Sequence, residues 1–246
     1  RSELSCFRPG GALCRAAILD FTYQAVAARI VFGPGKISEI ADEVDRLGGK
    51  AALLISTGSQ RAAADAAAAA LGQTCVARID GAVMHVPRGD VQNAVALARQ
   101  HKCDCVIAIG GGSAVGVAKG VALETELPIL AVPSTYAGSE MTDIWGISEG
   151  GGKVTGRDRR VVPKCVIYDP DLTRGLPARI AGPSGINAMA HSVEALYAQH
   201  RNPVLSLVAA GGLRAPAARL PAAGDGNADA EDAGRAADGG VRRGRA

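Results

Sequence analysis

Short apolar runs alternate along the chain with segments in which apolar residues recur every three or four positions. The apolar runs occupy residues 51–56, 74–79, 105–109 and 128–133. They are rich in Val, Ile and Leu and too short for helices, which predicts strands buried on both faces. The helical spacing occupies residues 37–47, 61–71, 91–101 and 114–124. Such alternation predicts an α/β fold, a Rossmann-like parallel sheet with helices on both faces.

A glycine turn follows the run at 105–109. Gly110, Gly111 and Gly112 precede Ser113, a residue type that can cap the helix expected from 114. Free N–H groups at a helix start, next to glycines that let a ligand approach the backbone, favour a phosphate. The pattern is neither a Walker motif nor the strict G-x-G-x-x-G. By itself it fits an ordinary turn as well as an anion site.

Two further loops should meet this turn, because ligands on parallel sheets bind at the carboxyl ends of the strands. One loop is 57–59 and the other is 134–140, which is polar, contains glycine and directly follows a strand. A solvated linker is the alternative for 134–140. Its place after a strand favours a site loop that contains Ser134 and Thr135.

The pattern changes after residue 146, where glycines and short polar runs predict a β-hairpin-like excursion. It contains a basic cluster of Lys153, Arg157, Arg159 and Arg160. This cluster is either a solvated face or a receptor for a carboxylate, since arginine pairs with carboxylates in a fork.

Composition argues against a nucleic-acid-binding protein, a membrane protein and a disulfide-rich protein. The 246 residues carry a net charge of +3 from 27 basic and 24 acidic side chains, a balance that gives no reason to expect nucleic acid. We find no apolar run of membrane-spanning length and no signal-peptide core, so no membrane partner is expected. The six cysteines form no C-x-x-C pair, which favours reduced thiols and a cytoplasmic location over a disulfide framework.

Several ordered motifs resemble one family, the iron-containing alcohol dehydrogenase superfamily, and within it the maleylacetate reductases. The most telling runs are PSTYAGSEMTDIW at 133–145 and INAMAHSVEALYA at 186–198. Other matching runs lie at 21–24, 29–33, 110–119, 152–163 and 168–173. The resemblance covers about residues 20–206.

This resemblance implies reduction of the carbon–carbon double bond of maleylacetate, a small dicarboxylate, to 3-oxoadipate by NADH or NADPH. It also implies a homodimer. The pyrophosphate would lie on Gly110, Gly111, Gly112 and Ser113, with Ser134 and Thr135 beside the cofactor. The expected catalytic residues are His191 and Lys153, and those expected to bind substrate are Tyr136 and Arg157.

Two departures from the wider superfamily bear on metal binding. Most metal-dependent members carry Asp where Gly116 and Asn187 stand here, and a neutral amide is a weaker ligand than a carboxylate. We therefore expect no metal. The alternatives are a metal-dependent alcohol or polyol dehydrogenase of the same superfamily, or an inactive nucleotide-binding fragment.

Four segments are expected. Residues 1–19 form an extension of unknown role, 20–182 a dinucleotide-binding α/β domain, and 183–206 the first helix of an all-helical second domain. Residues 207–246 are expected to be disordered, because they show no apolar periodicity and are rich in Ala, Gly, Arg, Pro and Asp. We interpret the chain as C-terminally truncated or frameshifted, since this composition resembles out-of-frame translation of GC-rich DNA. A genuine disordered tail is the alternative.

Overall fold

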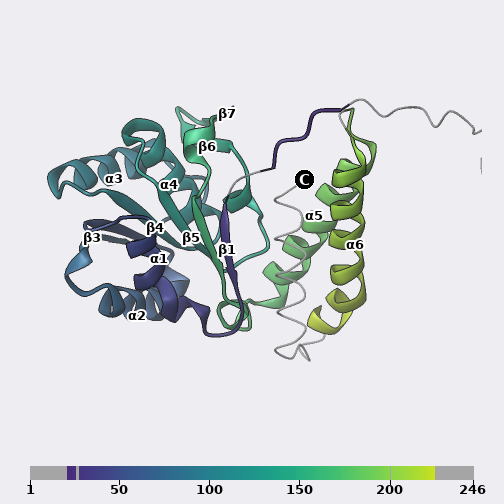
Figure 1. Cartoon of the computed structure of the whole chain (residues 1–246), viewed down its shortest axis with the longest axis horizontal. Coiled ribbons are helices and arrows are strands. Elements are labelled where there is room, and N and C mark those ends of the chain that lie inside the picture. Colours follow the sequence, from purple (N-terminus) through teal and green to yellow (C-terminus); the bar gives the residue numbers. More distant parts are fainter. Residues whose placement is uncertain (1–20, 26–27, 200, 225–246) are drawn as a thin grey trace, which may run out of the picture.

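A six-stranded parallel sheet forms the centre of the computed structural model, which describes residues 21–25, 28–199 and 201–224 (Figure 1). The strand order is β1-β8-β5-β4-β2-β3. The strands are β1 (Arg29–Phe32), β2 (Ala52–Ser56), β3 (Cys75–Asp80), β4 (Cys105–Gly110), β5 (Ile129–Pro133) and β8 (Cys165–Tyr168). Every residue of β2, β4, β5 and β8 is buried, which explains their continuous apolar sequences.

Helices cover both faces of the sheet. The first pair of helices is α1 (Ile40–Arg46) and α2 (Arg61–Leu71), and the second is α3 (Arg88–Gln100) and α4 (Gly112–Thr125). Successive strand residues face opposite sides, so Leu54 and Ile107 pack with α1 and α2, whereas Leu53 and Val106 pack with α3 and α4. The predicted Rossmann-like α/β fold is confirmed.

A separate antiparallel hairpin follows β5. It consists of β6 (Ile144–Glu149) and β7 (Gly152–Arg157), with Ile144 opposite Arg157 and Ser148 opposite Lys153. The short helical turn η4 (Ser139–Met141) connects β5 to this hairpin. The hairpin expected after residue 146 is therefore present and begins two residues earlier.

Two long helices, α5 (Ala178–Tyr197) and α6 (Pro203–Gly224), pack on each other beside the β1 edge (Figure 1). The expected boundary between 182 and 183 falls inside α5, which contains Pro183. The expectation of disorder from residue 207 is wrong over 207–224, which are helical. Ala209 is fully buried in this segment, and α6 packs on α5. The extension at 1–19 and residues 225–246 lie outside the described residues.

Two expectations drawn from composition can be compared with the described residues. Their four cysteines, Cys75, Cys103, Cys105 and Cys165, are all free, as reduced thiols require. None of the described helices combines the length and apolar character needed to cross a membrane.

Candidate functional site

The glycine turn leaves the start of α4 without a side-chain cap. Gly111 is the N-cap residue, α4 begins at Gly112, and no side chain of the described residues accepts from its first turn. Ser113, expected to cap the helix, is its second residue instead. Gly110 has φ = 145°, a conformation that favours glycine. Because Gly112 is exposed, its N–H and those that follow can reach an anion at the positive end of the helix dipole.

Three loops meet at this turn, as predicted. Thr57 N–H donates to Ile109 O at 3.1 Å, and Ser134 N–H donates to Gly110 O at 3.0 Å. A Cβ placed on Gly110 would lie 2.6 Å from Thr57 Oγ1, and one on Gly111 would lie 3.1 Å from Thr135 Cγ2. The turn therefore depends on glycine for the close approach of its neighbours. These bare amides, together with the hydroxyls of Thr57 and Thr135, suit a dinucleotide diphosphate.

Strand β6 of the hairpin lies along α4, from Ile144 beside Lys119 to Ser148 beside the contact of Val86 with Gly116. Near the tip of the hairpin, Ser148 N–H donates to Val86 O at 3.0 Å, and Val86 packs on Gly116, where an added Cβ would overlap with Val86 Cγ2. Gly116 is four residues past Gly112, so about 6 Å further along the helix. Lys153, opposite Ser148, is exposed on β7 near the tip of the hairpin, and its side chain lies over Gly146.

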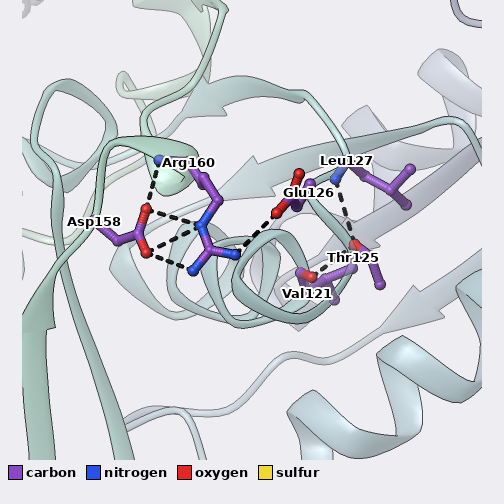
Figure 2. Close-up of polar contacts among 6 residues, drawn as sticks. All are labelled: Val121, Thr125, Glu126, Leu127, Asp158 and Arg160. Carbon is purple, nitrogen blue, oxygen red and sulfur yellow. Dashed lines mark hydrogen bonds and ion pairs between the residues drawn. The ribbon is translucent and has the colours of Figure 1, made fainter.

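The three arginines of the basic cluster have partners away from this end of α4. Arg157 pairs with Asp143 at 2.9 Å, at the base of the hairpin, and Arg159 donates to Gln24 Oε1 at 2.6 Å. Figure 2 shows Arg160 between Asp158 and Glu126, the residue that caps the C-terminus of α4. Glu126 is about 20 Å along α4 from Gly112. The arrangement favours a structural role for Arg160.

Tyr136 occupies a closed environment. It lines a cavity of about 10 Å³, room for about one water molecule, together with Glu140, Tyr168 and Thr173. Burial raises the pKa of the Tyr136 hydroxyl. Across the cavity, Tyr168 donates to Glu140 Oε1 at 2.7 Å. Tyr136 is thus placed beside the glycine turn but buried, and its role toward substrate stays a prediction.

His191 lies on the exposed surface of α5. Its Nδ1 is 3.0 Å from Oε2 of Glu194, one turn along the same helix, and both side chains are more than half exposed. Within the described part of the chain, no group of three His, Cys, Asp or Glu residues could hold a metal ion.

A roomier groove of about 600 Å³ lies away from the glycine turn, between β3 and α3. Its lining includes Arg78, Asp80, Asn93, Gln100 and Val117. Asp80 is engaged there, accepting from Ser56 Oγ and Arg78 Nε, each at 2.8 Å. None of the residues 110–113 of the glycine turn belongs to the lining of this groove.

Two residues that hold the hairpin against α4 were not predicted from the sequence. Val86 and Lys119 join the hairpin to α4, Val86 through Gly116 and Lys119 through hydrogen bonds to Thr142 and Ile144. Their signals were weak, because a valine in a loop and a lysine in an apolar helix suggest no partner. A lysine within the apolar sequence 114–122 was nevertheless unusual enough to mark a buried cation.

Comparison with known proteins agrees with this geometry. The family model for iron-containing alcohol dehydrogenase matches residues 27–170. The chain is 49% identical to a maleylacetate reductase of Sphingobium indicum over 203 residues, which is 82% of this chain and 57% of that protein. It is 47% identical to maleylacetate reductase 2 of Cupriavidus pinatubonensis over 85% of this chain and 58% of that protein.

A solved structure extends the comparison to the fold. The crystal structure of maleylacetate reductase from Agrobacterium tumefaciens superimposes with a TM-score of 0.89 at 42% identity, over 93% of this chain and 65% of that one. The chain thus spans somewhat more than half the length of the curated relatives that it matches. The match to the family model covers more than half of the chain, and the chain belongs to the iron-containing alcohol dehydrogenase family.

Proposed function

We propose that this chain carries the nucleotide-binding part of an NAD(P)H-dependent maleylacetate reductase, which converts maleylacetate to 3-oxoadipate. The observation that carries the proposal is the uncapped glycine turn at the start of α4, in a chain 45–49% identical to several maleylacetate reductases. The turn offers main-chain donors to a diphosphate, and the relatives supply the reaction.

Different residues near the turn would bind different parts of the cofactor. Amides of Gly111, Gly112 and Ser113 would hold the diphosphate, and Thr135 would contact the adjoining ribose. The bound cofactor would supply a hydride. Lys153, on the hairpin tip, would place its ammonium group beside the nicotinamide.

Hydride addition to the alkene moves negative charge onto the conjugated ketone, which requires a hydrogen-bond donor and then a proton. We assign His191 to the donor role. Its exposed imidazole has access to protons from solvent. Arg157 is assigned to a substrate carboxylate, for which it would have to exchange its ion pair with Asp143.

The test combines a fluorescence titration of the purified chain with NADH and an assay of maleylacetate reduction. Binding with turnover supports the proposal. Binding without turnover favours an inactive nucleotide-binding protein, and absence of binding contradicts the site itself. Adding Zn²⁺ or Fe²⁺ and assaying alcohol oxidation tests the metal-dependent alternative.

We further propose that the protein forms a homodimer, that it is located in the cytoplasm and that its reaction requires no metal ion. Asn187 supports the last point, because an amide binds metal ions more weakly than a carboxylate. The free cysteines fit a reducing compartment. Sedimentation of the purified chain tests the dimer.

A further inference from the structure

We propose that Lys119 is a positioning residue: its ammonium group fixes the hairpin β6–β7 along α4 and so sets the position of Lys153 relative to the glycine turn. The inference rests on the proposed nucleotide site for its functional consequence. Its structural part can be tested without any ligand.

Lys119 lies on the third turn of α4, inside an otherwise apolar surface. Only 1% of the residue is exposed. Its Nζ donates to Thr142 O at 2.8 Å, to Ile144 O at 2.7 Å and to Thr142 Oγ1 at 3.2 Å. Three acceptors match the three N–H bonds of an ammonium group, so the charged form is fully satisfied there.

The cost of burying this cation indicates that the contact is specific. Burial lowers the pKa of Lys119 to about 8, although the nearby carboxylates of Glu140 and Asp143 act in the opposite direction. A methionine would fill similar space without this cost, but it would leave the carbonyls of Thr142 and Ile144 without a donor. The role of the lysine is therefore to donate hydrogen bonds to the two carbonyls at the start of the hairpin.

Fixing the base of the hairpin also determines where its tip lies. Lys119 holds the chain at Thr142 and Ile144, and Ser148 contacts the Val86 carbonyl four residues further on. Between these two points β6 runs toward the N-terminus of α4. Lys153, opposite Ser148, is consequently placed by two contacts, of which Lys119 supplies the one at the base.

The experiment uses the full chain with Lys119→Met, Lys119→Arg and the exposed-site control Lys164→Met. Amide hydrogen exchange is measured for β6 and β7 against β4 as an internal reference. In Lys119→Met we expect exchange in the hairpin to rise about tenfold while β4 stays protected, and Lys119→Arg to restore part of the protection. Unchanged hairpin exchange in a folded Lys119→Met protein overturns the proposal.

A double-mutant cycle on NADH affinity tests the functional part. If Lys119 acts through Lys153, the loss of affinity caused by Lys153→Met shrinks toward nothing in the Lys119→Met background. Additive losses contradict the coupling. If Lys153→Met alone has no effect, the nucleotide role of Lys153 fails, while hydrogen exchange still decides the structural claim.

Should Lys119→Met fail to fold, Thr142→Val provides the second variant. It removes one of the three acceptors and leaves both carbonyl bonds, and it also removes the hydrogen bond that Thr142 Oγ1 donates to Ser139 O. A smaller rise in hairpin exchange, in the same direction, supports the proposal, and an unchanged exchange rate contradicts it.

Discussion

Replacing Gly112 by alanine should strengthen the fold and weaken cofactor binding at the same time. Gly112 is the first residue of α4, and an added Cβ would meet nothing closer than Ala137 Cβ at 3.8 Å, an ordinary contact. The change should raise the free energy of unfolding by about 0.4–1 kcal/mol, because alanine restricts the unfolded chain. The methyl group would, however, stand between the turn and loop 134–140, where the diphosphate is expected.

Losing one hydrogen bond from a backbone amide to a charged phosphate costs about 1.5–3 kcal/mol. The NADH dissociation constant should therefore rise about tenfold to about a hundredfold. Urea unfolding gives the stability, and quenching or enhancement of NADH fluorescence gives the affinity.

Gly89→Ala is the matched control, because Gly89 lies in the first turn of α3 and a Cβ there would meet no atom within 4 Å. It should bring the same gain in stability with unchanged NADH affinity. Equal dissociation constants for Gly112→Ala and Gly89→Ala would show that the diphosphate does not lie at this turn.

Three further outcomes are expected. Gly116→Ala should lower the free energy of unfolding by about 1–3 kcal/mol through overlap with Val86, and this loss should vanish in a Val86→Ala background. Urea unfolding of the wild type, the two single variants and the double variant measures both losses, and an equal loss in both backgrounds contradicts the prediction. His191→Ala should reduce maleylacetate turnover far more than NADH affinity while leaving stability within about 0.5 kcal/mol, because the side chain is exposed; unchanged turnover removes His191 from the mechanism. The pKa of Lys119 is lowered to about 8 in the folded chain against 10.5 when unfolded, so between these pH values the unfolded chain binds more protons and stability rises with pH. Between pH 8 and 10.5 the free energy of unfolding of the wild-type chain should rise by about 3 kcal/mol relative to that of Lys119→Met, as measured by urea denaturation at each pH. If the difference in unfolding free energy between the two proteins does not change with pH, the pKa of Lys119 is not lowered.

The fold was predictable because its strands and helices carry different periodicities. The buried strands β4 and β5 are continuous apolar runs, and the alanine-rich segment that forms α2 buries Ala64, Ala67 and Leu71 at helical spacing. The glycine turn was predictable for the same local reason, since it joins a strand to a helix. These features depend on neighbours in sequence.

The parts that sequence could not predict depend on contacts between distant segments. Nothing near Val86 indicates that it packs on Gly116, and nothing near Lys119 identifies the carbonyls of Thr142 and Ile144 as its partners. The helix over 207–224 was missed because its sequence contains glycines and prolines and shows no apolar periodicity, whereas in the structure α6 packs on α5. Propensity judged in isolation underestimates such a segment.

The contact between Val86 and Gly116 has a consequence for recombining this protein with its relatives. A relative with aspartate at the position of Gly116 would place a larger side chain where Val86 now packs. The loop around Val86, helix α4 and the hairpin held by Lys119 therefore pack as one unit, and their sequences must match one another. Chimeras whose crossovers keep these three segments from a single parent should express as folded protein, whereas those that divide them should aggregate.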